Sequence, residues 1–228
     1  KAASGGCSAT GWTCIGDANG PETNTIGTLT AGVEYYILVD AESTASVTHT
    51  FQINCPCPDA TISYSGSPYC QNAGTANVTL TGSAGGTYSS TAGLNINAAT
   101  GAVTLGTSTP GTYTVTYSIA AAGSCPLFTT TASITVNPTP NAIATPAIQT
   151  ICSGATITPI VLTSGVVGTT YTWTRDNTAG VTGIPGNGVG NISGTLTNIT
   201  AAPITVTFTI TPTANGCPGP TSTATVLV

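Results

Sequence analysis

Small polar and apolar residues alternate through long stretches of the chain, in the pattern of a half-buried β-strand. The segment 113–119 reads YTVTYSI, and 204–211 repeats the pattern as ITVTFTIT. Thr, Val, Ile and Tyr fill these runs, and Gly, Pro and Asn fall between them, which is typical of a β-rich chain with many turns. The pattern therefore predicts an all-β fold.

The cysteines mark out an internal repeat. Cys70 lies in YCQNAG before the apolar run NVTLTG, and Cys152 lies in ICSGAT before PIVLTSG. Cys125 and Cys217 each follow the long alternating run of their own half. The sequence therefore predicts two diverged copies of one β unit that is bracketed by cysteines.

The repeat divides the chain into three predicted domains. Residues 1–56 form a small β unit, which could be the end of a jelly-roll-like domain, and residues 57–138 and 139–228 each have the size of an immunoglobulin-like sandwich. INAATGAVTL is predicted to be a hairpin with Gly101 in its turn. The Pro-containing segment 137–141 is predicted to be a short, fairly stiff linker.

In the second copy we expect Trp173 to pack in the sandwich core, as immunoglobulin-like domains pack a tryptophan. The Gly-rich segment 175–191 is expected to be the most loop-like surface of this copy. Expected strands cover 143–151, 159–163, 169–175, 194–200, 204–211 and 221–228.

Eight cysteines in a β-rich chain predict a disulfide framework and an oxidising compartment. The alternative is zinc, but zinc sites need two close cysteine pairs or Cys/His knuckles. We expect one disulfide in each sandwich, Cys70–Cys125 and Cys152–Cys217. Among the other four cysteines three pairings stay open, although we favour Cys14–Cys55. Those four are Cys7, Cys14, Cys55 and Cys57.

Charged residues make up only 4% of the chain, against about 25% in a typical domain. Lys1 and Arg175 are the only basic residues, too few to displace the counterions of a nucleic acid or to bind an anionic membrane surface. Apolar runs are shorter than the ~20 residues that span a bilayer, so no membrane insertion is expected. Because Met is absent, we expect a processed protein or a piece of a longer one.

The sequence lacks the sets of residues that catalysis usually requires, and we predict that the protein is not an enzyme. A Ser/His/Asp constellation needs a histidine as its base, and the only histidine, His49, falls on an apparent strand face, where a plain strand residue explains it better. The two repeats contain only Asp59 and Asp176, too few for the facing carboxylates of a glycosidase. The remaining acidic cluster is more simply explained as a solvated strand end, and comprises Glu34, Asp40 and Glu42.

Metal binding has one weak candidate, in the loop GDANGPE. Asp17, Asn19 and Glu22 offer oxygen ligands for calcium, but the ligand set is incomplete and a simple turn explains the loop as well. No metal or cofactor is therefore predicted.

The segments GLNINAATGAVTLGTSTPGTYTVTYSI and ICSG, TYTWTRD, TVTFTITPTANGC together resemble a known class of repeat. They are similar to the PKD-like and bacterial immunoglobulin-like repeats of long cell-surface adhesins in gliding bacteria, which leave by the type IX secretion route. The resemblance covers most of residues 57–228. It implies tandem β-sandwiches on a secreted, cell-surface protein. Related repeats often carry Asp where this chain has Asn97, which argues against a calcium site there.

The resulting hypothesis is a structural segment of a multi-repeat adhesin stalk or filament. Its partners would be neighbouring repeats of the same chain, like chains in a fibre, and surface glycans. The alternative is an accessory carbohydrate-binding or spacer module of a secreted polysaccharide-degrading enzyme. Aromatic residues that could stack on sugar are Trp12, Tyr35, Tyr36 and Tyr171.

Overall fold

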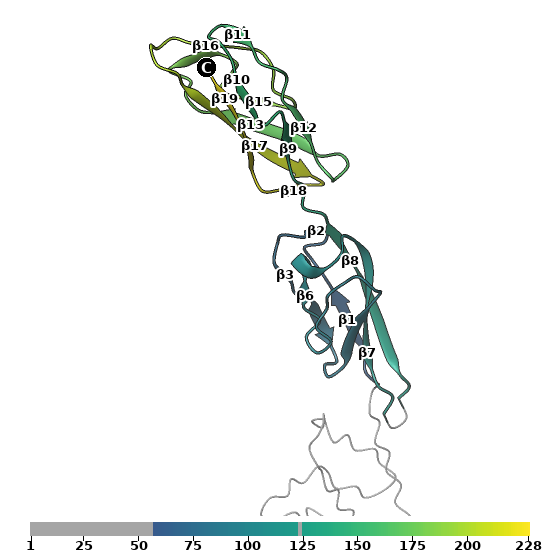
Figure 1. Ribbon diagram of the computed structural model, residues 1–228. Coiled ribbons are helices and arrows are strands. Elements are labelled where there is room, and N and C mark those ends of the chain that lie inside the picture. The colour runs from purple at the N-terminus through teal and green to yellow at the C-terminus, as the bar shows by residue number, and fades with distance from the viewer. Residues whose placement is uncertain (1–56, 123–124) are drawn as a thin grey trace, which may run out of the picture. The chain divides into compact units, whose positions relative to one another are not determined.

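The computed structural model describes residues 57–122 and 125–228, and it is all-β (Figure 1). Strands β1–β8 form one sandwich, here the first sandwich, and strands β9–β19 form the second sandwich. The predicted fold class of tandem immunoglobulin-like sandwiches is confirmed. The predicted small unit at 1–56 lies outside the described residues, together with Cys7, Cys14 and Cys55.

The first sandwich has two layers. In one layer the strands are hydrogen-bonded in the order β2-β8-β7-β5, and the other layer consists of the pairs β1-β4 and β3-β6. The strands are β1 (Ala60–Ser63), β2 (Tyr69–Cys70), β3 (Thr75–Ala76), β4 (Thr79–Gly82), β5 (Thr87–Ser90), β6 (Val103–Thr104), β7 (Gly111–Ile119) and β8 (Phe128–Asn137), with one 3-10 turn, η1 (Leu105–Thr107).

The second sandwich repeats this arrangement with added strands. Its larger sheet has the order β10-β19-β17-β13-β15, with β18 on β17, and β11-β16-β14 and β12-β9 make the other layer. The strands are β9 (Ile143–Thr145), β10 (Ile148–Thr150), β11 (Ala155–Thr156), β12 (Val161–Thr163), β13 (Thr170–Arg175), β14 (Val181–Gly183), β15 (Asn187–Val189), β16 (Thr195–Asn198), β17 (Thr205–Ala214), β18 (Cys217–Pro218) and β19 (Ser222–Leu227).

The two sandwiches share a topology as well as sequence motifs. In each, the short second strand runs parallel to the last long strand: β2 along β8, and β10 along β19. The long antiparallel hairpins β7–β8 and β17–β19 also correspond. The predicted repeat is therefore present in the fold, and each copy ends with a strand that lies beside its own cysteine-bearing segment.

Alternation of the side chains explains the two cores. Along β17 and β7 every second residue points inward, because successive side chains of a strand face opposite sides. Tyr117 and Val115 of β7 are buried in the first core, and Phe208 and Ile210 of β17 in the second. Trp173 is buried as predicted and packs edge to face on Phe208, with ring centroids 5.7 Å apart.

The Gly-rich segment 175–191 is not the open loop that its composition predicts. It contains β14 and β15, and Val181 and Ile184 are buried in the core. The sequence pattern missed this because glycines between short apolar residues resemble a turn-rich loop. Here Gly188 lies where an added Cβ would collide with the Trp173 ring, so glycine permits close packing rather than flexibility.

Candidate functional site

The hairpin that follows β17 carries Cys217. Residues 214–217 read Ala-Asn-Gly-Cys, and Asn215 and Gly216 have φ values of 50° and 76°. Positive φ at both central residues is the mark of a type I′ turn, which Asn-Gly favours and which matches the twist of antiparallel strands. Ala214 and Cys217 pair across this turn. The local sequence therefore holds Cys217 at a fixed place on the hairpin.

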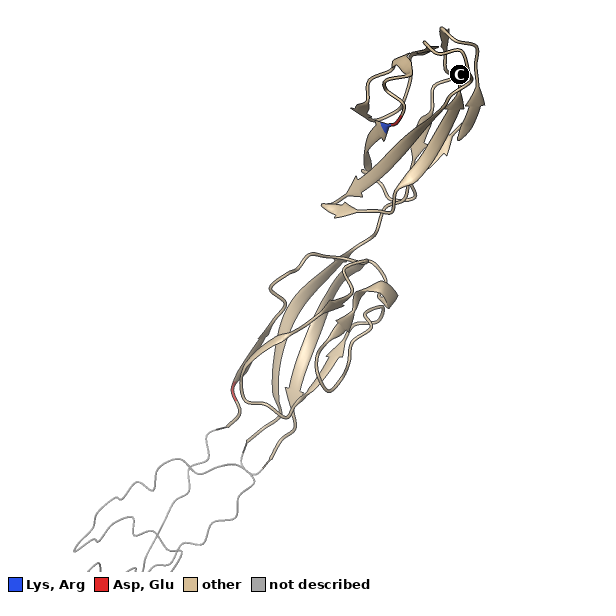
Figure 2. Ribbon diagram, turned by 90° about the vertical axis from the view of Figure 1, so that its left-hand side faces the viewer, with Lys and Arg blue, Asp and Glu red and all other residues tan. Residues whose placement is uncertain are grey.

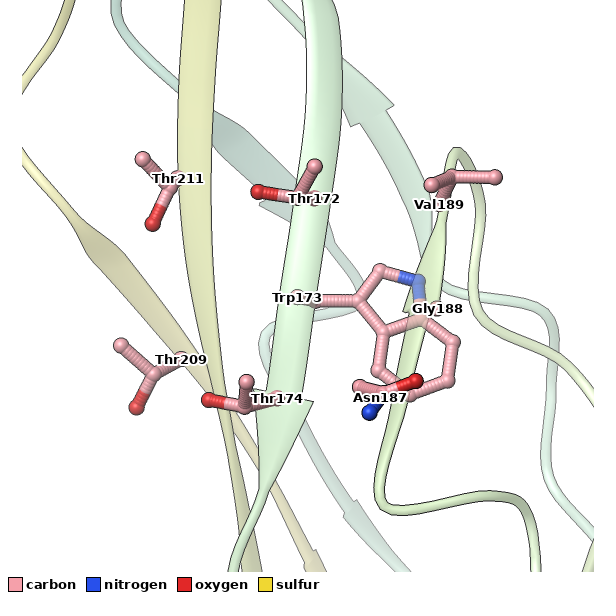
Figure 3. Close-up of a pocket in the computed structure, with 8 residues that line it drawn as sticks. All are labelled: Thr172, Trp173, Thr174, Asn187, Gly188, Val189, Thr209 and Thr211. Atoms are coloured by element: carbon pink, nitrogen blue, oxygen red, sulfur yellow. The ribbon is translucent and has the colours of Figure 1, made fainter.

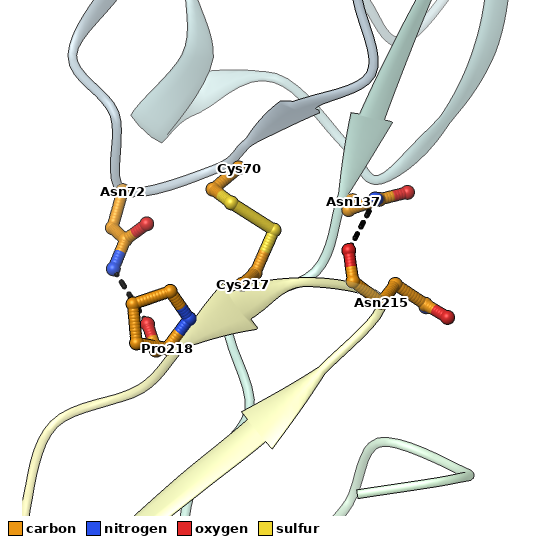
Figure 4. Close-up of a disulfide and its surroundings, with 6 residues drawn as sticks. All are labelled: Cys70, Asn72, Asn137, Asn215, Cys217 and Pro218. Carbon is orange, nitrogen blue, oxygen red and sulfur yellow. Dashed lines mark hydrogen bonds between the residues drawn. A yellow bond between two sulfur atoms is a disulfide. The ribbon is translucent and has the colours of Figure 1, made fainter.

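Cys217 is bonded to Cys70 of the first sandwich, across 147 residues of sequence (Figure 4). The two Cα atoms are 5.4 Å apart, within the usual range for a disulfide. Cys70 ends β2 and pairs with Asn137, the last residue of β8. The bond thus joins the segment beside the exit of the first sandwich to a hairpin of the second.

Two hydrogen bonds flank this disulfide. The side-chain amide of Asn72 donates to the Pro218 carbonyl oxygen at 3.0 Å, and that of Asn137 donates to the Asn215 carbonyl oxygen at 3.2 Å (Figure 4). Cys217 itself is only 1% exposed. The residues Asn72, Asn137, Asn215 and Pro218 together with Cys70 and Cys217 are called the joint below.

The linker contributes to the same region. Pro140 is buried, and a Cβ placed on Gly219 would collide with its carbonyl oxygen. The Gly219 N–H donates to the Pro212 carbonyl oxygen at 2.9 Å, which fixes the chain after β18 against the end of β17. Glycine at position 219 is therefore required by the close approach of the linker.

The predicted pairings Cys70–Cys125 and Cys152–Cys217 are both wrong. Cys70 lies beside the end of β8 and Cys125 just before its start, and a strand of 10 residues separates the two by roughly 30 Å. A disulfide needs Cα atoms within about 7 Å. Likewise Cys217 precedes β19, whereas the residue before Cys152 donates from its N–H to Leu227 at the end of β19.

Cys125 is instead bonded to Cys57, which lies three positions before β1, with Cα atoms 5.3 Å apart. The first sandwich therefore has one internal disulfide, as predicted, but with a different partner. The second has no internal disulfide and shares one with the first. Cys152 is exposed and has no disulfide partner among the described residues.

One signal in the sequence could have revealed the bond between the sandwiches. The first copy, 57–138, contains three cysteines, Cys57, Cys70 and Cys125, so one of them cannot pair within it. The prediction assigned Cys57 to the N-terminal unit and thereby removed this signal. Which two of the three pair internally depends on their positions on the sheet, which the repeat pattern alone does not give.

Charge is nearly absent from the described residues (Figure 2). Arg175, at the end of β13, is buried, and burial lowers the pKa of its guanidinium while Asp176 opposes that shift. Its Nε donates to the Ile184 carbonyl oxygen at 2.7 Å and its Nη2 to that of Val181 at 2.9 Å. Arg175 therefore satisfies main-chain acceptors around β14 that would otherwise be buried without partners.

A shallow cavity of about 310 Å³ lies beside Trp173 (Figure 3). Thr172 and Thr174 of β13 line it together with Asn187 and Val189 of β15. None of its lining residues titrates near neutral pH, so the cavity offers no general acid or base. The Trp173 side chain is only 6% exposed, so its ring presents no open face for stacking on a sugar.

The other predicted candidates are distributed as follows. Tyr171 is half-buried against the second core, and Asp59 and Asp176 lie in different sandwiches. Among the residues that the structure describes, no three His, Cys, Asp or Glu side chains gather as a metal site, and no helix could span a membrane. The candidates outside the described residues are Trp12, Tyr35, Tyr36, His49, Asp17, Asn19, Glu22, Glu34, Asp40 and Glu42.

The Asn97 turn is supported by its own side chain. Asn97 Oδ1 accepts from the N–H groups of Ala99 and Thr100, at 2.9 and 3.1 Å, and Gly101 has a φ of 71°. Ile96 and Val103 pair across it, as the hairpin prediction expects. An uncharged side chain that closes a turn is a sufficient role for this residue.

Comparison with known families finds that residues 149–228 match the model of the PKD-like domain. The match covers most of the second sandwich and about a third of the chain. No curated protein is similar to the chain. The PKD-like character of the second sandwich is thus confirmed, while nothing in the comparison bears on gliding bacteria or type IX secretion.

The solved structures that match the chain share little sequence with it. The chain is 11% identical to Drosophila N-cadherin EC1-4, with a TM-score of 0.42. The match covers 76% of this chain and 49% of the cadherin fragment. For the titin I-band fragment I67-I69 the identity is 12%, the TM-score 0.38 and the coverage 76% and 65%. The chain spans about half of the cadherin fragment.

Disulfide-bonded PKD-like and immunoglobulin-like sandwiches are domains of an extracellular type, because disulfides persist in oxidising compartments. With this fold and with the joint described above, the chain is a tandem array of extracellular-type β-sandwiches, and residues 149–228 are similar to the PKD-like domain family.

Proposed function

We propose that this chain is a structural segment of a long, secreted, multi-repeat protein of the bacterial cell surface, an adhesin stalk or filament, and not an enzyme. Its partners are the neighbouring repeats of the same chain and like chains in a fibre. Adhesion or gliding, with export by the type IX route, is the setting that the sequence resemblance implies. The observation that carries the proposal is the disulfide between the two sandwiches, Cys70–Cys217.

The two disulfides interleave along the sequence, since Cys70 lies between Cys57 and Cys125, whereas Cys217 lies beyond them. A pulling force therefore has a short covalent path through the protein. It runs from β1 to Cys70, across the disulfide to Cys217, and on through β19. The linker and the strands from β3 to β17 are bypassed, so these parts stay out of the force path while the disulfide is intact.

The surface supports a role in a protease-rich environment outside the cell. Trypsin-like enzymes cut after Lys or Arg, and the chain has only Lys1 and Arg175. Arg175 is buried with its guanidinium hydrogen-bonded inside the second sandwich, so the native fold withholds it from a protease. Such resistance suits a stalk, whereas a transient signalling protein would not require it.

Single-molecule force spectroscopy tests the proposal. With handles at Asp59 and Val228, the oxidised chain has a taut path of about 11 residues to Cys70 and about 11 from Cys217, roughly 80 Å. In the double variant Cys70→Ser/Cys217→Ser the path runs through Cys57–Cys125 and about 103 further residues, roughly 360 Å. We expect this difference in final extension.

The variant Cys152→Ser is the matched control, because it also removes a cysteine but leaves both disulfides intact. It should extend like the parent chain. Equal extension of the parent and the double variant, or peptide mapping that finds Cys70 reduced in protein from an oxidising compartment, would contradict the proposed mechanical role.

A further inference from the structure

Cys152 opens the same kind of turn in the second sandwich that Cys70 opens in the first, and it lies two residues further along in strand register. Cys70 is the last residue of β2 and Cys152 lies two residues after β10, and each opens a turn in which its carbonyl oxygen accepts from the N–H three residues on. The distances are 3.0 Å from Ala155 and 2.9 Å from Ala73. A glycine of positive φ, Gly154 or Gly74, then leads into β11 or β3.

Both cysteines lie where the last strand of their sandwich ends. Cys70 pairs with Asn137 at the end of β8. In the second sandwich Thr150 pairs with Leu227 at the end of β19, and Cys152 follows two residues later. Beyond β8 the chain enters the second sandwich, whose hairpin supplies Cys217 to Cys70. Cys152 is therefore placed at the corresponding exit of the second sandwich.

The hairpin cysteines correspond as well. Cys125 pairs in a β-bridge with Ala122, as Cys217 does with Ala214, each three residues after its alanine. Cys217 is bonded to the preceding sandwich, and Cys125 is bonded to Cys57, ahead of β1. In both sandwiches the hairpin cysteine is therefore bonded to a cysteine on the N-terminal side of its own first strand.

We propose that Cys152 forms a disulfide with the hairpin cysteine of a further sandwich of this type that follows β19 in the same chain. The proposal rests on the proposed function, a multi-repeat chain, and specifies how its successive repeats are joined. The precedent is within the molecule: Cys70, which opens the corresponding turn of the first sandwich, makes this bond to the next hairpin cysteine.

The surroundings of Cys152 fit such a partner. Ser153 is fixed on Asn198, since its Oγ donates to the Asn198 carbonyl oxygen at 3.1 Å and accepts from the Asn198 N–H at 3.0 Å. The turn that carries the thiol is thus held in place. Near this end Ile199 is 62% exposed and Leu227 is 38% exposed. Apolar side chains at this rim gain from being covered by a following sandwich.

The chemistry is an ordinary thiol–disulfide exchange with a small disulfide such as oxidised glutathione as the oxidant. The Cys152 thiolate attacks one glutathione sulfur and forms a mixed disulfide, releasing one glutathione thiolate. The thiolate of the hairpin cysteine then attacks Cys152 Sγ and releases the second. The two cysteines lose two electrons and two protons in total, and both glutathione molecules leave as thiols.

The test extends the full chain by one sandwich. A second copy of residues 139–228 is fused after Val228, which gives the same one-residue spacing after β19 that Pro138 gives after β8. The added copy carries Cys152→Ser, so that one Cys152 remains, and Thr221→Ser as a mass label beside its Cys217. After folding with oxidised and reduced glutathione, we expect mass spectrometry to find Cys152 bonded to the labelled Cys217.

Thiol labelling with a maleimide gives a second readout. Cys152 should react in the 228-residue chain and be protected in the extended chain. An extended chain whose added copy also carries Cys217→Ser is the matched control, and there Cys152 should react again. Cys152 that stays reactive in the extended chain while Cys70–Cys217 has formed would overturn the inference and leave the proposed function standing.

Other partners for Cys152 would also overturn it. A bond to Cys7, Cys14 or Cys55 in the 228-residue chain would make it a staple within that chain. A covalent dimer through Cys152–Cys152 would show that its partner is a second copy and not a hairpin cysteine. Failure of the Cys70–Cys217 bond itself would instead remove the proposed function.

Discussion

The two sandwiches have one topology but are held together differently. The first has two disulfides, Cys57–Cys125 before β1 and Cys70–Cys217 beside the end of β8, whereas among the described residues the second is bonded through Cys217 alone. The second has the additional strands β14 and β15 and the buried Arg175. The fold thus fixes where strands lie, while each copy stabilises them by its own chemistry.

Their cores differ in the same way. Each has an aromatic pair joining β5 to β7 or β13 to β17, Tyr88–Tyr117 in the first and Trp173–Phe208 in the second. Tyr117 also uses its hydroxyl, which donates to the Ser83 carbonyl oxygen at 3.0 Å and accepts from the Gly86 N–H at 2.9 Å. Phe208 cannot do this. Tyrosine hydroxyls therefore satisfy main-chain groups in the first sandwich, a role that Arg175 has in the second.

The largest effect on this comparison should come from removing Cys70–Cys217. Closing a loop of 147 residues contributes about 5 kcal/mol by chain entropy, so the variant Cys70→Ser/Cys217→Ser should lose about that much stability. Scanning calorimetry should then resolve separate transitions for the two sandwiches. Removing Cys57 and Cys125 as serines is the comparison variant, and its loss of about 4 kcal/mol should be confined to the first sandwich. A single unchanged transition in the first variant would contradict this coupling.

An intermediate effect is expected from Arg175→Met, which fills similar volume but leaves the carbonyl oxygens of Val181 and Ile184 without their donor. Hydrogen bonds to a charged group contribute about 1.5–3 kcal/mol each, so losing two near the low end of that range should cost the second sandwich about 3–4 kcal/mol in urea unfolding. Arg175→Lys is the control, because it keeps the charge but cannot reach both acceptors, and it should recover less than half of the loss. Full stability in the lysine variant would show that charge alone is what matters.

A smaller effect should appear at high pH and only in the first sandwich. Burial raises the pKa of Tyr64 to about 12, with further contributions from Tyr88 and Tyr69, and its hydroxyl donates to the Gly101 carbonyl oxygen at 2.6 Å. Because the pKa of this acid is higher in the folded than in the unfolded chain, the stability is fully present below pH 10 and is lost as pH rises towards 12. The loss should be roughly 2–3 kcal/mol.

Absorbance at 295 nm measures the tyrosinate, and near-ultraviolet circular dichroism measures the fold in the same titration. Tyr64→Phe removes the titrating group, so its stability should fall less steeply over this pH range than that of the parent chain. A parent chain that keeps equal stability at pH 10 and pH 12 would be inconsistent with a buried phenol at this position.

Much of the fold could be predicted from the chain itself, because alternation of polar and apolar residues has the period of a strand. The alternating runs at β7, β13, β17 and β19 lie close to where they were expected, and Trp173 lies in the core. The Gly-rich segment was misjudged because Val181 and Ile184 are short apolar anchors separated by glycines. No local pattern shows that Arg175 points inward to hold them.

The sequence by itself determined the all-β class, the two copies, the oxidising compartment and the near absence of charge, since these depend on composition and local periodicity. Only the tertiary structure decided which cysteines meet. A disulfide requires Cα atoms within about 7 Å, and that depends on which end of a strand each cysteine occupies. Cys70 and Cys125 are near in sequence but lie at opposite ends of β8, whereas Cys70 and Cys217, 147 residues apart, meet at the joint.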